Sequence, residues 1–345
     1  MEDDNSLQPT TDSEKVQAAT RDSDYWFDDG NLILVSQGVS FRIYKGLLAE
    51  HSAVFHNMFH IGQAMPEEED LVDGCPVVPL DDSPNDLREL FRLIYPLSIN
   101  LKFSGKKVDI AFISAIIRLD HKYELKGVYN QAMGYLTTYY TTSFDAWVDG
   151  RNSVPWKPEP VHAIRAINLA RLTNATSILP AAFYICATRG PDILHGFPHG
   201  DADADGSTGV ERLTPADLRL CLEMKVRLAD ENAHTAFLLF RPPDDAQVCS
   251  NSLRYCADVW RKLLEHAGLS KAPHPVASER ALDSWMENAD CLPRWPLEGA
   301  YDPAARRTLC GGCVAHLQAR DRELRRQVWG RLPELLGLTI ENWDA

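Results

Sequence analysis

The sequence predicts an α+β protein with a small β-sheet and helical hairpins in its N-terminal part and a mainly α-helical C-terminal part. Two apolar segments on either side of a glycine-containing turn, residues 31–35 and 39–43, have the composition of a β-hairpin. Beyond residue 45, apolar side chains recur at helical spacing. The chain of 345 residues also exceeds the usual size of one domain, roughly 100–200 residues, so we expect two domains.

The N-terminal elements follow one another closely. Residues 45–59 carry apolar side chains at helical spacing, with a break at residues 51–52, which predicts two short helices. Residues 75–80 (CPVVPL) predict a third strand, whose prolines suit the edge of a sheet. A helix is expected to begin after Ser83, because a capping hydroxyl is followed there by Pro84 and then by an acid in the first turn. Two further helical stripes follow: Phe112, Ile116, Leu119 and Tyr123, and then Leu125, Val128, Ala132, Leu136 and Tyr139.

Composition and periodicity divide the chain into four segments. We expect a disordered acidic tail at 1–23, the sheet-and-helix domain at 24–145, a linker rich in proline at 146–160 and a helical domain at 161–345 with a loop at 196–209. Within the last segment, helices are predicted at 161–172, 179–187, 215–240, 253–266, 277–286 and 314–332.

Charge and hydropathy exclude some classes of partner. The formal net charge of −14 repels phosphate backbones, so we do not expect nucleic acid as a direct partner. The longest apolar runs, such as residues 111–117 and 178–187, are shorter than the ~18 residues that a membrane span needs. The first 24 residues resemble neither a secretory signal nor a transit peptide. We therefore expect a cytoplasmic or nuclear protein with no membrane segment.

Three segments in order carry a family resemblance. Residues 28–35 (DDGNLILV), 41–59 (FRIYKGLLAEHSAVFHNMF) and 90–95 (LFRLIY) together resemble the BTB/POZ family over roughly residues 24–140. The whole chain resembles BTB proteins of filamentous and mushroom-forming fungi, which pair this domain with a helical, cysteine-bearing tail. The resemblance implies an adaptor that dimerises or docks a protein partner. Six apolar residues of these segments are expected to fill the core: Phe41, Leu47, Leu48, Phe55, Met58 and Phe59.

Two positions bear on dimerisation in the family. Asn31 stands where dimeric members often have an aspartate, which faces a basic residue at the position of Lys45. Tyr44 stands where the family usually has histidine. Asn31 and Lys45 are therefore candidate dimer-pocket positions in a pocket that lacks the family's acidic partner.

A short motif follows the second of the predicted helices. Family members that recruit a cullin-type ubiquitin ligase often carry an apolar residue, any residue and a glutamate there, and Met65 and Glu67 fit this pattern. The alternative is an acidic loop exposed to water, because charge runs normally face solvent.

The cysteines of the C-terminal half have spacings that allow a metal site. Cys310 and Cys313 enclose two glycines, which let the backbone turn tightly, and Cys249 and Cys256 lie upstream. Four thiolates can close a tetrahedral structural zinc site. The six-residue gap between Cys249 and Cys256 also fits unrelated buried thiols, so zinc and unbound thiols remain alternatives and no cofactor is certain.

Catalytic signals are weak. The segment DADADG at 201–206 imitates half of a calcium-binding loop, but Arg212 stands at the twelfth position, where the ion needs a carboxylate, so a flexible acidic loop is expected. Phosphate-binding, dinucleotide-binding, zinc-protease and nucleophile-elbow motifs are missing from the sequence. We expect a protein-binding adaptor and no enzyme. The alternatives are a non-dimerising protein that acts through its helical domain and an enzyme of unrecognised type.

Overall fold

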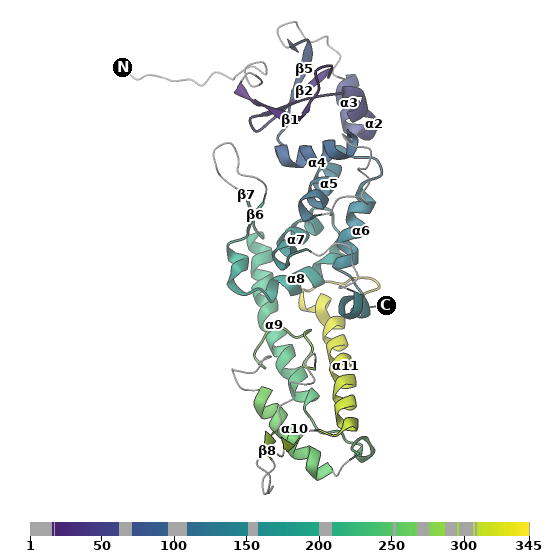
Figure 1. Cartoon of the computed structure of the whole chain (residues 1–345), viewed down its shortest axis with the longest axis vertical. Helices are drawn as coiled ribbons and strands as arrows, with labels where there is room; N and C mark the ends of the chain where they lie inside the picture. Colours follow the sequence, from purple (N-terminus) through teal and green to yellow (C-terminus); the bar gives the residue numbers. More distant parts are fainter. Residues whose placement is uncertain are drawn as a thin grey trace, which may run out of the picture. The chain divides into compact units, whose positions relative to one another are not determined.

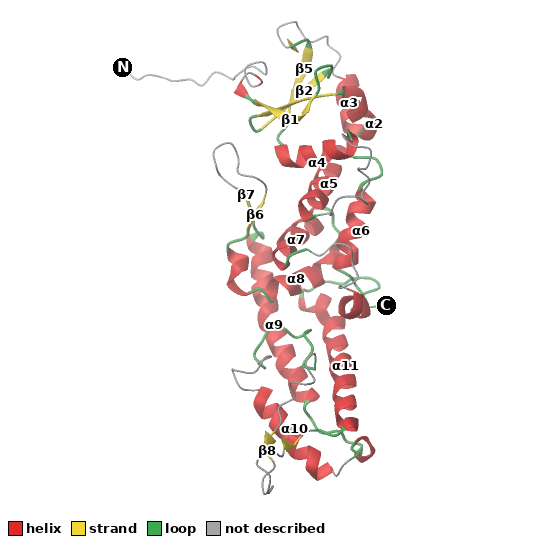
Figure 2. Cartoon of the chain, in the orientation of Figure 1, coloured by secondary structure: helices red, strands yellow, loops and turns green. Residues whose placement is uncertain are grey.

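The structure is a computed structural model, and the chain divides into two compact units (Figure 1). It describes residues 16, 18–61, 71–95, 109–150, 158–199, 209–250, 253–267, 276–286, 295–296, 306–307 and 309–344. The first unit contains Met1–Tyr139, Val154–Ala175 and Gly196–Glu211. The second contains Tyr140–Ser153, Thr176–His195 and Arg212–Ala345. The first unit combines a sheet with helices and the second is mainly helical (Figure 2), so the predicted α+β class is confirmed.

A five-stranded mixed sheet organises the first unit. Its strands are β1 (Thr20–Trp26), β2 (Leu32–Ser36), β3 (Val39–Ile43), β4 (Leu71–Val72) and β5 (Cys75–Pro79), in the order β1-β3-β2-β5-β4. The predicted hairpin is confirmed, with Leu34 opposite Phe41 in antiparallel β2 and β3. Gln37 and Gly38 form its turn with φ of 43° and 79°, and two positive φ angles give the twist that suits a two-residue hairpin.

The prediction that β5 lies at the edge is wrong, because β4 lies outside it. The two strands pair antiparallel through Leu71 with Pro76 and Val72 with Cys75. The turn between them has φ of 49° at Asp73 and 74° at Gly74. An aspartate followed by glycine is a strong hairpin signal, and it could have identified β4 from the sequence.

Strand β1 was also missed, since residues 20–23 were expected to belong to the tail. Its sequence is polar, and a buried carboxylate holds it in place. Asp22 Oδ1 accepts hydrogen bonds from the amides of Asp24 (3.0 Å) and Tyr25 (2.9 Å). Its second oxygen pairs with Arg88 Nε of α4 at 2.7 Å. This ion pair spans 66 positions, so local sequence patterns do not reveal it.

The helices of the first unit are α2 (Lys45–His51), α3 (Ala53–Ile61), α4 (Pro84–Ile94), α5 (Ile110–Tyr123), α6 (Tyr129–Tyr139) and α7 (Ala163–Leu172), with a 3-10 turn at Pro160–His162. The predicted break between α2 and α3 is confirmed. Ser52 Oγ accepts a hydrogen bond from Phe55 N at 3.0 Å, which caps α3, and donates one to Tyr123 O at 2.6 Å. The predicted start of α4 is confirmed too, since Ser83 Oγ accepts from Asn85 N at 3.2 Å.

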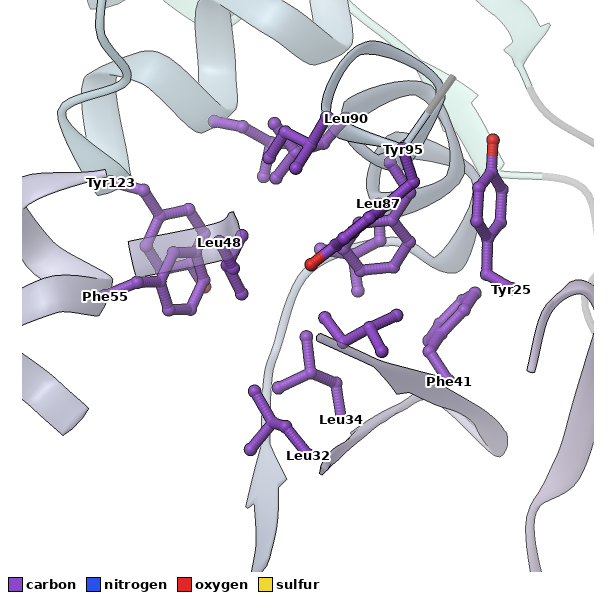
Figure 3. Close-up of a cluster of buried hydrophobic side chains, with 14 of the residues drawn as sticks. Tyr25, Leu32, Leu34, Phe41, Leu48, Phe55, Leu87, Leu90, Tyr95 and Tyr123 are labelled. Carbon is purple, nitrogen blue, oxygen red and sulfur yellow. The ribbon is translucent and has the colours of Figure 1, made fainter. Parts of the chain in front are cut away.

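The main core of this unit lies between the sheet and its helices (Figure 3). Leu32, Leu34 and Phe41 point from the strands toward Leu87 of α4. Phe41 packs edge-on against Phe91, with ring centroids 5.2 Å apart. The alternate β2 residues form a second buried cluster with Cys75 and Val16. All five β2 residues are therefore buried, as expected for a strand covered on both faces.

The first unit extends beyond the predicted boundary near residue 145. Helix α7 packs against α5. In the expected loop 196–209, β6 (Phe197–His199) pairs with β7 (Gly209–Glu211), and residues 200–208 lie outside the described part. Arg165 Nε of α7 pairs with Glu211 Oε2 at 2.5 Å, and both side chains are buried. An ion pair between residues this far apart gives no local signal in the sequence.

The second unit contains α8 (Leu179–Ala187), α9 (Pro215–Leu239), α10 (Leu253–Ala267) and α11 (Gly311–Leu335), 3-10 turns at Thr176–Ile178, Gly190–Leu194 and Ala246–Val248, and the paired strands β8 (Trp295–Pro296) and β9 (Arg306–Arg307). Helices α9 and α11 run side by side, and α8 packs on both. The predicted cap of α9 is confirmed, with Thr214 Oγ1 accepting from Asp217 N at 3.1 Å. No helix among the described residues is both long and apolar enough to cross a membrane.

The expected linker at 146–160 begins inside the second unit. A π-helical turn, Ala146–Gly150, buries Trp147 against Trp329, with ring centroids 5.1 Å apart. Asp145 Oδ1 accepts from both Arg322 and Arg326 of α11 at 2.7 Å. Residues 151–157 lie outside the described part.

The predicted helix at 277–286 is wrong, because this segment is a series of turns. Backbone amides of this segment donate hydrogen bonds to side chains of other elements. Leu282 N donates to Tyr184 Oη at 3.1 Å, and Trp285 N donates to Asp321 Oδ1 at 3.1 Å. These long-range hydrogen bonds replace the ones that a helix would have made.

We predict that Asp321→Ala destabilises the second unit by about 3 kcal/mol, because it leaves a buried guanidinium without its carboxylate. Asp321 is 1% exposed, and its Oδ2 accepts from Ser284 Oγ at 2.7 Å and Arg325 Nε at 3.0 Å. Urea unfolding followed by tryptophan fluorescence measures the loss. Glu323→Ala, an exposed acid on the same helix, should change the free energy of unfolding by less than about 0.5 kcal/mol. Equal losses in the two variants would contradict the assignment.

Candidate functional site

The two candidate dimer-pocket residues lie together at the start of α2. Asn31 Oδ1 accepts a hydrogen bond from the backbone N of Lys45 at 2.8 Å. The ammonium of Lys45 lies 5.3 Å from the centre of the Phe59 ring. Asn31 thus satisfies an amide in the first turn of α2, where Tyr44 provides no side-chain cap. Asn31 therefore contacts Lys45 through a neutral hydrogen bond to the backbone, and this contact is not an ion pair.

Tyr44, at the position where the family usually has histidine, is fixed within its own domain. Its hydroxyl donates to Asp29 Oδ1 at 2.6 Å, and its ring stacks on Phe27 with centroids 5.0 Å apart. The hydrogen bond to Asp29 raises the pKa of Tyr44 above its ordinary value. The carbonyl of Tyr44 also accepts from Tyr95 Oη at 2.8 Å. Tyr44 is therefore held by aromatic packing and by two hydrogen bonds, one of them to the carboxylate of Asp29.

Two residues expected in the core lie on the surface of the α2–α3 hairpin. Phe41, Leu48, Phe55 and Phe59 are buried as predicted, but Leu47 is 45% exposed and Met58 is 39% exposed. A seven-residue helix such as α2 buries one face, and Leu48 occupies it. Two adjacent leucines on so short a helix were a usable signal that one of them faces solvent. Leu47 and Met58 are candidate partner-contacting residues that the sequence analysis did not identify.

Met65 and Glu67, the candidate cullin-binding residues, lie outside the described residues. So does the acidic segment 201–206. In sequence, Met65 and Glu67 fall between the end of α3 and the start of β4.

Four cysteines of the second unit meet in one cluster, as the zinc hypothesis requires. Cys249 follows the 3-10 turn Ala246–Val248, Cys256 belongs to α10, Cys310 precedes α11 and Cys313 lies in its first turn. Their four sulfur atoms all lie within 4.8 Å of one another. The sulfurs of Cys249 and Cys310 are 3.8 Å apart, well beyond the ~2.05 Å of a disulfide bond.

Gly312 permits the approach of the chain segments that carry these cysteines. A Cβ atom at this position would overlap the carbonyl oxygen of Val248, the residue before Cys249. At Gly311, a Cβ would meet no neighbouring atom. Of the two glycines in the Cys-Gly-Gly-Cys segment, only Gly312 is required by packing.

The surroundings of the cluster are apolar and include Trp260. Trp260 is 1% exposed. Among the described residues, no acceptor meets the usual distance and angle criteria for a hydrogen bond with its indole Nε1. Burial raises the pKa of the Cys313 thiol strongly and nearby Cys310 adds to this, while the indole N–H beside the sulfur acts in the opposite direction. Burial also raises the pKa of Cys256 to about 11, against the effect of a hydrogen bond from the Cys310 backbone. N–H donors therefore face sulfur atoms in a water-poor site.

A hollow between α9 and α11 bears on the enzyme alternative. Among its lining residues, the titratable ones are His234 and Arg331. Arg331 pairs with Glu231 of α9. A hollow of the first unit is also lined by titratable residues, Asp120, His121 and Glu124 among them, and it too is a place where the enzyme alternative can be tested.

Comparison with known proteins identifies one domain within the first unit. The family model described as the BTB/POZ domain matches residues 28–139. The chain therefore contains a BTB/POZ domain, which is a protein–protein interaction module, and the resemblance of residues 24–140 is confirmed. No curated protein matches the chain. The likeness to fungal BTB proteins stays a prediction.

We predict that Gly312→Ala lowers the free energy of unfolding by about 1–3 kcal/mol, because the added methyl group overpacks the contact with Val248. Thermal denaturation of the full chain measures the loss. Gly311→Ala is the matched control, since its methyl group meets open space. If Gly311→Ala proved as unstable as Gly312→Ala, glycine would be required by the backbone at the start of α11 and not by the contact with Val248.

Proposed function

We propose, from the BTB/POZ domain in residues 28–139, that this chain acts as an adaptor that self-associates through this domain and docks a protein partner. The observation that carries the proposal is the exposure of Leu47 and Met58 on the α2–α3 hairpin of the domain. A contiguous apolar patch on an interaction module marks a contact site, and we propose that Leu47 and Met58 belong to such a patch.

The chemistry of this surface favours apolar contact over ion pairing. Complete burial of a leucine or methionine side chain contributes roughly 1.5–3 kcal/mol. Asn31 is neutral and its oxygen already accepts from the amide of Lys45, so it offers no charge to a lysine of a second copy. Self-association of this kind should depend little on salt, because screening weakens only interactions between charges.

We predict that the full chain is a dimer and that the double variant Leu47→Asp, Met58→Asp is a monomer, since two carboxylates would have to be buried in the interface. Analytical ultracentrifugation at low and high salt measures the mass and its salt dependence. The control is Val226→Asp, Phe237→Asp, which changes two apolar side chains of α9 that are 65% and 60% exposed. A wild-type chain that stays monomeric at high concentration would end the self-association proposal.

The same variants address the alternative function. Helix α9 exposes Leu222, Val226 and Phe237, which favours a second apolar contact surface on the helical unit. If the α9 variant loses a bound partner while the α2–α3 variant keeps it, the chain acts through its helical unit, as the non-dimerising alternative requires.

Recruitment of a cullin-type ubiquitin ligase is a finer form of the proposal. It rests on the position of Met65 and Glu67 in the segment that joins α3 to β4. An apolar side chain and a carboxylate in this segment would supply an apolar contact and one charged hydrogen bond to the partner.

We predict that a cullin is retained by the intact chain in a pulldown from cell extract and lost from Met65→Ala, Glu67→Ala. Mass spectrometry of the retained proteins gives the readout. Glu68→Ala, Glu69→Ala removes two acids of the same run and should leave cullin binding unchanged. Absence of a cullin from the intact sample would remove ligase recruitment and leave the interaction module.

A further inference from the structure

Four cysteine sulfur atoms lie close together in the second unit, although they come from two segments that are far apart in sequence. Cys249 and Cys256 come from the connection between α9 and α10 and from α10 itself, and Cys310 and Cys313 come from the start of α11. We propose that these four cysteines bind one Zn²⁺ ion as thiolates and that the ion has a structural role.

The distances between the sulfurs suit a tetrahedral ion. With Zn–S bonds of ~2.3 Å, the edge of the tetrahedron is about 3.8 Å. The sulfurs of Cys249 and Cys310 are 3.8 Å apart, and all four lie within 4.8 Å of one another. Small movements of the side chains would therefore complete the coordination. No disulfide joins the described cysteines, so all four sulfurs can serve as ligands.

Hydrogen-bond donors around the cluster suit thiolates. The buried indole N–H of Trp260 lies beside the sulfur of Cys313 and has no other acceptor among the described residues. The backbone N–H of Cys310 faces the sulfur of Cys256. Metal-bound thiolates commonly accept such N–H···S contacts, which offset their negative charge. Cys310 and Cys313 also lie at the N-terminus of α11, where the helix dipole favours negative charge.

The donor set selects the class of metal. Four thiolates are soft ligands, so they favour zinc over magnesium or calcium, which prefer oxygen. Four protein ligands leave no open position for a substrate, which is typical of a structural site. On binding, each thiol releases its proton to solvent and no electron is transferred. Iron also accepts four thiolates, and metal analysis distinguishes it.

The ion would link two segments of the chain that are far apart in sequence. Cys249 and Cys310 are 61 positions apart, and α10 and the β8–β9 pair lie between them. In Figure 1, α10 and the start of α11 lie at the same end of the second unit. Because the four sulfurs meet only in the folded chain, zinc binds the folded state and should stabilise it.

The test begins with the metal content of the full-length chain, purified without chelators from cells supplied with zinc and iron. We expect one zinc per chain by mass spectrometry of the metals. The double variant Cys310→Ser, Cys313→Ser should lose it. The control Cys75→Ser should keep it, because Cys75 lies in the first unit and its donation to Gly30 O at 3.2 Å is open to a hydroxyl as well. Iron in place of zinc, no metal in the wild type, or zinc retained by the double variant would overturn the proposal.

A second measurement covers the case in which the double variant does not fold. Cobalt exchanged into the wild-type chain should give the visible absorption of a tetrahedral tetrathiolate site, and a chelator should abolish the absorption and lower the melting temperature. Added zinc should restore the melting temperature. A chelator that leaves the melting temperature unchanged, or cobalt bands of an octahedral oxygen site, would contradict the proposal.

Discussion

The first unit depends on one strand that is buried on both faces. Every residue of β2 is buried, with Leu32 and Leu34 on the side of the main core and Ile33 and Val35 on the other. A strand of this kind needs partners on both edges and cover on both faces. β3 and β5 pair with the two edges of β2, and α2 to α4 pack on its main-core side. The α2–α3 hairpin is held by this packing, and its remaining surface exposes Leu47 and Met58.

Local patterns in the sequence predicted the parts of the fold that local interactions determine. The β2–β3 hairpin follows from two apolar runs and a glycine turn, and the starts of α4 and α9 follow from Ser83 and Thr214 as capping residues. Cys249 and Cys256 were considered together with Cys310 and Cys313 because two pairs of thiolates can close one metal site, and the four sulfurs lie within 4.8 Å of one another. In each case the residues that form the interaction lie close together in sequence or share an unusual chemistry.

The parts that were not predicted depend on contacts between distant residues. Strand β1 is polar and is fixed by the ion pair of Asp22 with Arg88. The segment 277–286 has the composition of a helix, but Tyr184 and Asp321 bind its backbone in an extended series of turns. The exposure of Leu47 depends on which face of α2 meets the core, and periodicity over seven residues cannot decide it.

We propose that the chain binds other proteins through the α2–α3 surface of its BTB/POZ domain. Hydrogen–deuterium exchange of the full chain at low and high protein concentration tests this surface against that of α9. We expect peptides covering Lys45–His51 and Ala53–Ile61 to become more protected as concentration rises, while peptides from Pro215–Leu239 do not change. Protection that stays the same in α2 and α3, or that rises in α9 instead, would contradict it.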